Sequence, residues 1–356
     1  MSALAFYFAR VLREKLDVPI GIVDVTMGGT RIEPWMRREL FTQSPALGHY
    51  LKEFEKLSDS YDVEAETKTY ERALKDWRKA VTLAEKKNTK LPDKPGMKRP
   101  PKERWQYPST FYNGMISPLK GFGIRGFLWY QGESNTGRAP SKPDHYKKSL
   151  QLLINDWRQQ WGMGELPFYF VQIAAFGITP RWDGKSVVRN QMREAMKIEN
   201  TGMAVTYDIG SVDNVHPLNK IEAGGRLALW PLLEVYQKGN IKTARGPIPV
   251  KAVLNNETIS IEFEATAKGL LVGSKTPLKE PVSAGIQVPM IEVQDEDGVW
   301  KEVSATLKNS KTVELDAKSI RLPQEIRYGW HSTPTGNVFL YNSEGLPASP
   351  FRIKVN

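Results

Sequence analysis

The strongest constraint on the fold is a regular alternation of apolar runs and amphipathic helices in the first two thirds of the chain. Three apolar runs are each followed by a stretch with apolar residues at helical spacing. The pairs of run and helix are 124–130 with 146–161, 166–174 with 186–198, and 203–208 with 219–236. Strands that alternate with helices of this length form parallel βαβ units. The alternation therefore predicts an α/β fold built on a parallel sheet.

The chain before residue 124 adds further elements to this pattern. Helical spacing predicts a helix over 3–16, and the apolar run 19–26 predicts a strand that is buried on both faces. A short helix is expected over 32–40. The segment of about 51–105 is rich in charged residues and helix formers. It ends in a stretch with four prolines. This composition predicts a solvated helical insertion with an exposed loop, which shields one side of the site.

After about residue 239 the pattern changes to short strands separated by turns. Such strands are expected at 248–254, 258–263, 269–273, 290–294, 312–315, 325–330, 338–341 and 350–355. At 295–298 three acidic residues are followed by a glycine, and this sequence predicts a hairpin turn. Many short strands with intervening turns are typical of a β-sandwich. The sequence therefore predicts an α/β domain over 1–238 and a β-sandwich domain over 239–356.

The composition argues against several classes of protein. The formal net charge is +10, but basic and acidic residues are mixed along the chain, without the basic stripe of a nucleic-acid-binding surface. No run approaches the roughly 20 apolar residues of a membrane-spanning helix. The chain contains no cysteine, which excludes disulfides, thiol catalysis and thiolate metal sites. We therefore expect neither a nucleic acid nor a membrane as a partner.

Two polar blocks directly follow predicted strands, at the position where open α/β sheets bind their ligands. The block after the run 203–208 contains Asp213 and His216 in the spacing D-x-x-H-P. An acid at this distance can fix the tautomer of an imidazole and stabilise its charge, as a general base requires. A lone histidine is more often structural, but of the four histidines only His216 combines an acid three residues upstream, a following proline and a place just after a predicted strand. We predict that His216 is a general base and Asp213 its orienting acid.

The other block follows the run 124–130 and contains Gln131, Glu133 and Asn135. The two amides can donate a hydrogen bond to an oxyanion and Glu133 can hold its neighbours, or the block caps a helix through Ser134. The pair Gly28–Gly29 follows the run 19–26. It can bring a backbone N–H close to an anion, or it can form only a tight turn. In acyl transfer, one oxyanion donor is worth about 10²–10³ in rate.

Over nearly its whole length the chain resembles the sialate O-acetylesterase family of the SGNH-hydrolase superfamily. The main shared blocks are G-I-V-D-V-T-M-G-G-T-R-I-E-P-W-M (21–36), F-Y-N-G-M-I-S-P-L (111–119), I-R-G-F-L-W-Y-Q-G-E-S-N (124–135), D-I-G-S-V-D-N-V-H-P-L-N-K (208–220) and L-Y-N-S-E-G-L-P-A-S-P-F-R (340–352). The blocks Q-G-E-S-N and H-P-x-N-K are specific when they occur together. Thr26 and Met27 stand where the family often has Ser-Trp, which puts the local pocket shape in question.

The resemblance implies a flavodoxin-like parallel sheet with helices on both faces, plus C-terminal β-sandwich elements. It implies hydrolysis of acetyl esters on a sugar, sialic acid or a plant glycan, by a Ser-His-Asp mechanism without metal or organic cofactor. His216 and Asp213 would be the base and its acid. The oxyanion and substrate-binding residues would be Gly28, Gly29, Asn113, Gln131, Glu133 and Asn135. Secretion or a periplasmic location is also implied, with any signal peptide upstream of Met1.

The nucleophile of this family is a serine in a G-Q-S-N block on the first strand of the sheet, and this sequence contains no such block. The other serines near the predicted site are poor substitutes for this nucleophile. Ser117 precedes a proline and indicates a turn, and Ser134 lies in the Q-G-E-S-N block, which has another role in the family. Ser211 lies in a loop and not at a turn from a strand into a helix. We consider, in this order, a C-terminal part of a longer enzyme, an inactive full-length descendant, and an enzyme with an unexpected serine. A carbohydrate-binding or interaction protein on an esterase scaffold is the alternative function.

Overall fold

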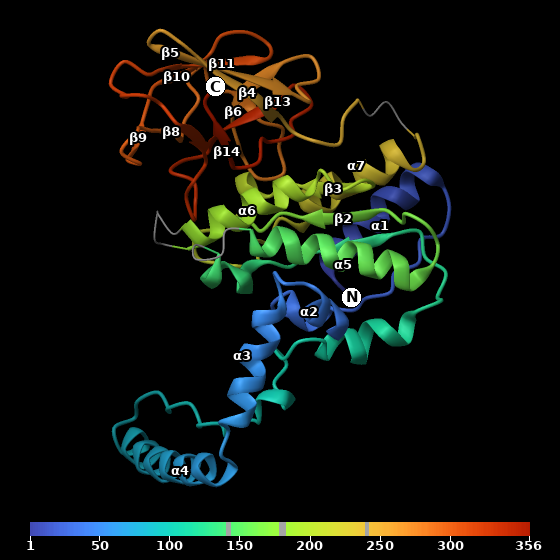
Figure 1. Ribbon diagram of the computed structural model, residues 1–356, viewed down its shortest axis with the longest axis vertical. Coiled ribbons are helices and arrows are strands. Elements are labelled where there is room, and N and C mark those ends of the chain that lie inside the picture. Colours follow the sequence, from blue (N-terminus) through green and yellow to red (C-terminus); the bar gives the residue numbers. More distant parts are fainter. Residues whose placement is uncertain (140–143, 178–182, 239–241) are drawn as a thin grey trace. The chain divides into compact units, whose positions relative to one another are not determined.

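The computed structural model describes residues 1–139, 144–177, 183–238 and 242–356 (Figure 1). The chain forms two compact units. Unit 1 comprises Met1–Ile32 and Leu119–Asn356, and unit 2 comprises Glu33–Pro118. The domain boundary predicted between residues 238 and 239 falls at the edge of the described residues. The division into an α/β domain and a β-sandwich domain stays a prediction.

A three-stranded parallel sheet organises the first part of unit 1 and confirms the predicted α/β fold. Strands β1 (Phe127–Trp129), β2 (Phe168–Val171) and β3 (Thr201–Ala204) lie in the order β1-β2-β3. Phe127 lies opposite Phe168, and Phe168 lies opposite Thr201. In the described structure β1 is therefore an edge strand, with β2 as its one neighbour.

Helices cover both faces of this sheet (Figure 1). They are α1 (Ala3–Leu16), α5 (His145–Trp161), α6 (Asp183–Ala195) and α7 (Lys220–Glu234). Alternate residues of a strand point to opposite faces. Tyr169 and Val171 of β2 share a core with apolar residues of α1 and α7, whereas Phe168 packs against Trp157 of α5. The helices predicted from apolar spacing are thus confirmed.

The strand predicted over 19–26 is wrong, because this segment pairs with no strand of the described structure. None of its residues is buried, and Val23 is 50% exposed. Ile20 reaches the core between α1 and α7, and Asp24 accepts a hydrogen bond from the backbone N–H of Ser2 at 2.7 Å. An apolar strand needs a neighbouring strand to cover it, and no described strand lies beside this segment.

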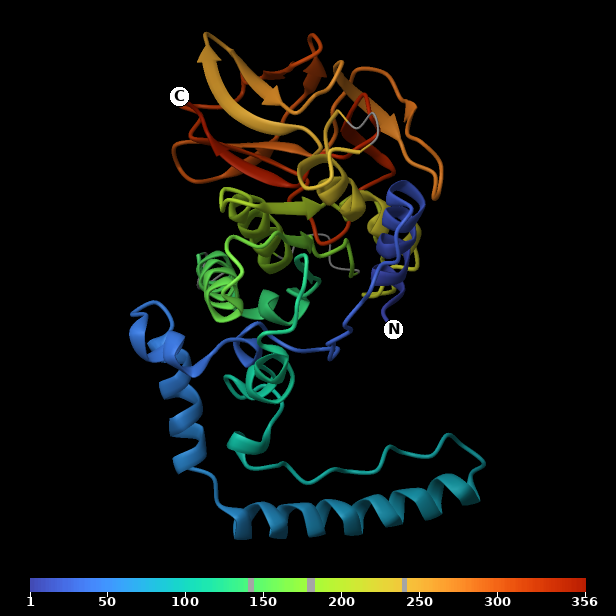
Figure 2. The same ribbon diagram turned by 90° about the vertical axis from the view of Figure 1, so that its right-hand side faces the viewer.

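Unit 2 is helical and contains the predicted insertion. Its helices are α2 (Arg38–Gln43), α3 (Gly48–Asp59) and α4 (Val63–Lys86). The proline-rich segment 88–100 runs along α4 (Figure 2), where the indole N–H of Trp77 donates to the carbonyl oxygen of Pro92 at 2.9 Å. The helix predicted over 32–40 is instead a short 3₁₀ turn followed by α2.

The C-terminal part of unit 1 consists of antiparallel sheets, as predicted. Its strands are β4 (Ile248–Asn255), β5 (Thr258–Glu264), β6 (Leu270–Ser274), β7 (Val282–Ser283), β8 (Ile291–Gln294), β9 (Trp300–Glu302), β10 (Ala305–Leu307), β11 (Thr312–Asp316), β12 (Glu325–Tyr328), β13 (Val338–Asn342) and β14 (Phe351–Lys354). They form the sheets β10-β11-β5-β4, β14-β12-β8-β9 and β13-β6-β7. The rings of Phe263 in β5 and Phe351 in β14 pack edge to face, with 5.9 Å between their centres, and so join two of these sheets.

The hairpin predicted at 295–298 is confirmed, because this turn joins β8 to β9. Strands β7, β9 and β10 were not expected, since each has only two or three residues and few of them are buried. Short helical turns connect the longer elements of the chain at η1 (Glu33–Trp35), η2 (Pro101–Glu103), η3 (Tyr112–Ile116), η4 (Ser117–Leu119), η5 (Glu133–Arg138) and η6 (Tyr207–Ile209).

Candidate active site

The loops that follow β1, β2 and β3 meet at one edge of the sheet, because the three strands run parallel. Two backbone hydrogen bonds join the loop after β2 to the loop after β3. The N–H of Ser211 donates to the carbonyl oxygen of Ala175 at 3.0 Å, and the N–H of Gly177 donates to the carbonyl oxygen of Val212 at 2.9 Å. Open α/β sheets bind ligands at this edge, so we take it as the candidate active site.

The loop after β3 is anchored at both ends. At its start, the fully buried carboxylate of Asp208 binds Arg226 of α7, and Gly210 packs so closely that a Cβ would lie 2.4 Å from the carbonyl oxygen of Ala175. At its end, the side chain of Asn219 caps α7 by accepting a hydrogen bond from the N–H of Glu222 at 3.1 Å. The residues between these anchors, 211–218, are held at the ligand edge.

Asp213 and His216 are both exposed in this loop. The carboxylate of Asp213 accepts a hydrogen bond from the hydroxyl of Ser211 at 2.5 Å, which lowers the pKa of Asp213. The backbone N–H of His216 donates to the side-chain oxygen of Asn214 at 2.8 Å. Within the described part of the chain no hydrogen bond or ion pair joins Asp213 to the imidazole of His216, so their predicted pairing stays a prediction.

Glu133 lies in the loop after β1, at the start of the short turn η5. Burial raises the pKa of Glu133, while the charges of His216, Lys220 and Arg189 lower it in part. Burial also lowers the pKa of Lys220, which Glu133 opposes. The Nζ atom of Lys220 lies 5.1 Å from the centre of the Tyr130 ring. Charged groups of α6, of α7 and of the loop after β3 therefore all act on the pKa of Glu133.

The amides of Gln131 and Asn135 hold the backbone together instead of pointing freely into the site. The Nε2 atom of Gln131 donates to the carbonyl oxygen of Thr30 and to Oδ1 of Asn135, both at 2.8 Å. The same Oδ1 accepts from the N–H of Ile32 at 3.0 Å, and the hydroxyl of Tyr146 donates to the carbonyl oxygen of Gln131 at 2.7 Å. Both hydrogens of the Gln131 amide are occupied, which does not favour the predicted oxyanion role for this residue.

The glycine pair and Asn113 are exposed. Gly28 and Gly29 form a turn in which Gly29 has a φ of +72°, a conformation that favours glycine. The hydroxyl of Thr30 donates back to the carbonyl oxygen of Met27 at 3.0 Å and closes this turn. Asn113 belongs to unit 2, in the π-helical turn η3. The binding roles expected for these three residues stay predictions.

Gly132 links the end of β1 to this block, and its substitution is expected to be costly. Its φ is +151°, and a Cβ would lie 2.8 Å from the Cγ2 atom of Ile173. We expect Gly132→Ala to lower the free energy of unfolding by about 1–3 kcal/mol through strain and overpacking, measured by denaturant titration. Gly137→Ala, with open space at the Cβ position, is the control and should cost less than about 0.5 kcal/mol. Equal losses would contradict this account.

No serine hydroxyl is hydrogen-bonded to the imidazole of His216 in the described ranges. The hydroxyl of Ser211 donates to Asp213, and Ser134 lies in the turn η5 after β1. Ser117 begins the short turn η4 and precedes a proline. None of the three follows a strand as the first residue of a helix.

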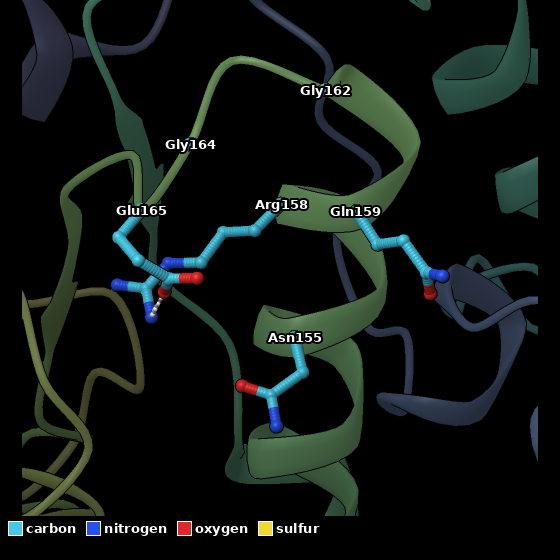
Figure 3. Close-up of a pocket in the computed structure, with 6 residues that line it drawn as sticks. All are labelled: Asn155, Arg158, Gln159, Gly162, Gly164 and Glu165. Carbon is cyan, nitrogen blue, oxygen red and sulfur yellow. Dashed lines mark hydrogen bonds and ion pairs between the residues drawn. The ribbon is translucent and has the colours of Figure 1, made fainter.

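A separate cavity of about 380 Å³ opens at the end of α5 (Figure 3). Arg158 forms part of its wall and is itself buried, with hydrogen bonds to the carbonyl oxygens of Leu166, Glu199 and Asn200 and an ion pair with Glu165 at 3.0 Å. These residues precede β2 and β3, so the cavity lies at the sheet edge opposite His216. The guanidinium fastens the loops there through these hydrogen bonds.

Neither a cluster of metal ligands nor a membrane-spanning helix is present in the described residues. Histidine, aspartate and glutamate side chains form no group of three or more that could hold a metal ion there. None of the described helices combines the length and apolar character needed to cross a bilayer.

Sequence reasoning missed the residues that build the frame of the site. Arg189 of α6 is fully buried and donates to four backbone carbonyl oxygens. Asp208 and Lys220 stand at the two ends of the block D-I-G-S-V-D-N-V-H-P-L-N-K. The sequence contained a signal for Asp208 and Lys220, because charged residues on both sides of a loop often anchor that loop. The interior arginine on α6 had no such signal, since nothing in the sequence shows that four carbonyl groups surround it.

A match to a known protein family lies in the middle of the chain. A family model described as "Carbohydrate esterase, sialic acid-specific acetylesterase" matches residues 100–228. The matched range includes β1 to β3 and the loops that carry Gln131, Glu133 and His216.

Similar proteins are longer than this chain. The sialate O-acetylesterase of Rattus norvegicus is 26% identical over 380 residues, which cover 100% of this chain and 64% of that protein. The sialate O-acetylesterase of Homo sapiens is 28% identical over 71% of this chain and 43% of its own length. The chain thus spans less than two thirds of the length of these relatives.

A solved structure shares the fold. The crystal structure of a carbohydrate acetylesterase from Xanthomonas citri matches with a TM-score of 0.71 and 26% sequence identity. The match covers 99% of this chain and 65% of that structure's chain. The likeness therefore extends over the sheet, its helices and the C-terminal strands.

Proposed function

Because the chain belongs to the sialate O-acetylesterase family of carbohydrate esterases, we propose that it forms the histidine-bearing part of an esterase that removes acetyl groups from sugars. The observation that carries this proposal is the exposed position of His216 at the ligand edge of the sheet. A general base must reach its substrate there. Asp213 in the same loop provides a carboxylate for an imidazolium.

In the proposed reaction a serine oxygen attacks the acetyl carbonyl carbon while His216 takes the serine proton. The bond to the sugar oxygen then breaks, and His216 returns the proton to that oxygen. A water molecule attacks the acetylated serine in the same way, which releases acetate and restores the serine. The proposal needs no metal and no organic cofactor.

We propose that the serine lies on a strand outside these 356 residues, at the open edge of β1. Leu128 at this edge is 37% exposed, although its neighbours Phe127 and Trp129 are buried. The segment 19–26 is apolar, and its residues are exposed or half-buried. Its end is joined to the end of β1 through the hydrogen bond from Gln131 to Thr30. A strand between β1 and this segment would cover both, and unpaired apolar edges otherwise promote aggregation.

The first test is the rate at which the purified 356-residue chain hydrolyses 4-nitrophenyl acetate. Since the serine is absent from the chain under this proposal, wild-type protein and the variant His216→Ala are expected to react at the same low rate. Any excess over water is at most the roughly 10³–10⁴-fold contribution of binding and oxyanion contacts. Turnover that depends on His216 in the chain alone would overturn the external serine.

The esterase function itself is tested on a longer chain. Where the coding sequence upstream of Met1 continues in frame and encodes a G-Q-S-N block, the extended protein is expected to release acetate from O-acetylated sugars, and His216→Ala should abolish the release. Binding of sugars without any release of acetate by the extended protein would favour the carbohydrate-binding alternative. A panel of O-acetylated sialic acids and acetylated xylan separates the two substrate classes.

A further inference from the structure

We propose that Leu278, in the loop between β6 and β7 (275–281), contacts the acetylated sugar, and that Glu222 of α7 is the positioning residue that holds Leu278 in place. This inference rests on the proposed esterase function for the identity of the ligand. Its structural basis is a set of hydrogen bonds and ion pairs at Glu222, which lies 56 positions from Leu278 in the sequence.

The carboxylate of Glu222 joins the β6–β7 loop to the loop after β3. Its Oε1 atom accepts a hydrogen bond from Nδ2 of Asn219 at 2.9 Å and another from the backbone N–H of Leu278 at 2.6 Å. Asn219 ends the loop after β3 and lies three residues beyond His216. Two donors that share one oxygen atom are neighbours in space, so the tip of the β6–β7 loop lies beside the end of the His216-bearing loop.

The second carboxylate oxygen of Glu222 fixes the start of the β6–β7 loop. Its Oε2 atom pairs with Nζ of Lys275 at 2.7 Å and with Arg226 at 3.3 Å. The same Nζ donates to the carbonyl oxygen of Lys279 at 2.5 Å. Desolvation opposes the charge of Glu222, but the hydrogen bonds from Lys275 and Asn219 outweigh it, and the pKa of Glu222 is lowered. Glu222 is therefore an ionised acceptor at neutral pH and holds the loop at its start and its tip.

The backbone of Leu278 adopts a conformation that favours glycine. The N–H of Lys279 donates to the carbonyl oxygen of Thr276 at 3.1 Å and closes a turn with Pro277 and Leu278 in its middle. Leu278 has a φ of +61°, and a proline followed by a left-handed residue is the arrangement of a type II turn. Such strain persists only where the surroundings impose it. The bond to Glu222 imposes it here, and a leucine in this place points to a use for its side chain.

Two large apolar side chains are exposed where these loops meet. Leu278 is 59% exposed, and Leu218, which directly precedes Asn219, is 89% exposed. Single exposed leucines are ordinary, but these two come from distant parts of the chain and are brought together by Glu222. Ligand sites are lined mainly by apolar side chains, and His216 is exposed at the same edge of the sheet. The C–H faces and the acetyl methyl of an acetylated sugar fit such a surface.

The contact is tested by methyl NMR of the leucines in the 356-residue chain, titrated with an O-acetylated sialic acid and with acetylated xylobiose. The signals of Leu278 and Leu218 should shift with at least one of these sugars. Leu278→Gly should weaken its binding about three- to tenfold, because an apolar contact is lost. Glycine suits the φ of +61°, so this variant should unfold at the same denaturant concentration as wild-type protein.

Leu322→Gly is the matched control, because Leu322 is also exposed, at 62%, and also left-handed, with a φ of +43°. It lies in the turn before β12, and its replacement should leave the affinity for sugar unchanged. Equal affinities in Leu278→Gly and Leu322→Gly, or no binding of either sugar by wild-type chain, would overturn the contact. Shifts of the Leu278 signal that follow protein concentration without sugar would identify a second copy as the occupant and would overturn it too.

The role of Glu222 is tested by hydrogen exchange of the Leu278 amide. In Glu222→Ala this amide should exchange at least about tenfold faster, because it loses a charged acceptor, and sugar affinity should fall as well. Glu222→Gln keeps an oxygen acceptor and should retain part of both, and it decides alone should Glu222→Ala fail to fold. Unchanged exchange would refute the positioning role.

These readouts need neither a serine nor the release of acetate. A failed esterase assay on the extended protein therefore leaves them intact. Conversely, acetate release by the extended protein together with an unchanged sugar affinity in Leu278→Gly would remove this inference alone.

Discussion

Replacing Arg189 by methionine is expected to lower the free energy of unfolding of unit 1 by about 3–5 kcal/mol. The side chain is fully buried. Its guanidinium donates to the carbonyl oxygens of Ile173 and Ala174 after β2, at 3.0 and 2.7 Å. It also donates to those of His331 and Ser332, at 2.8 and 3.0 Å. One side chain thus ties the ligand edge of the parallel sheet to the C-terminal strands.

The size of this effect follows from what a methionine would leave behind. Hydrogen bonds from a charged donor contribute about 1.5–3 kcal/mol each, and an unsatisfied buried carbonyl costs about 1–3 kcal/mol. Ser332 keeps one partner, because its carbonyl oxygen also accepts the N–H of Phe176. Burial lowers the pKa of Arg189 to about 10, so part of the loss is offset when this costly charge is removed. The net loss is therefore smaller than the sum of four bonds.

The measurement is a guanidinium chloride titration followed by tryptophan fluorescence and circular dichroism. Arg193→Met is a matched control, because Arg193 lies one turn further along α6 and its main contacts are to Asn190 of the same helix, at 3.2 and 2.9 Å. Its replacement should cost about 1 kcal/mol. If both variants lost the same stability, the bridge through Arg189 would not explain how the two parts of unit 1 hold together.

The sequence predicted the regular elements well where local periodicity and burial agree. The helices α1, α5 and α7 and the hairpin at 295–298 form as expected. Their signals are local, since apolar spacing and capping residues such as Asn219 lie within one element. The two polar blocks were also predicted from local signals, because each directly follows an apolar run. In the structure they follow β1 and β3 and lie at the same edge of the sheet.

Other features depend on residues that are distant in the sequence and could not be predicted. The run 19–26 has the composition of a buried strand, but burial requires a neighbour, and a local pattern does not report whether one is present. Gln131 was expected to contact a ligand, yet its amide binds Thr30, about a hundred positions away. A polar side chain after a strand can serve a ligand or the backbone, and only the fold decides between them.

The last prediction concerns Asp208, which anchors the loop that carries His216. Asp208→Asn is expected to cost about 3–5 kcal/mol, because it removes one partner of a buried ion pair. Both carboxylate oxygens bind Arg226, at 2.6 and 2.7 Å, and Tyr341 donates its hydroxyl to Oδ2 at 3.0 Å. Burial and the charge of Asp208 raise the pKa of Tyr341, which keeps this hydroxyl a donor.

In this variant Arg226 would retain the carbonyl oxygen of Val205, at 2.8 Å, and the carboxylate of Glu222, at 3.3 Å. Glu222 already pairs with Lys275 at 2.7 Å, so the charge of Arg226 would be poorly compensated. The double variant Asp208→Asn/Arg226→Met removes the orphaned charge and should regain at least about 1 kcal/mol over Asp208→Asn, since an uncompensated buried charge is the main cost. Asp297→Asn is the control, because Asp297 and Arg321 are 66% and 70% exposed and such pairs contribute at most about 1 kcal/mol. No recovery in the double variant would mean that shape, and not charge, anchors the His216 loop at Asp208.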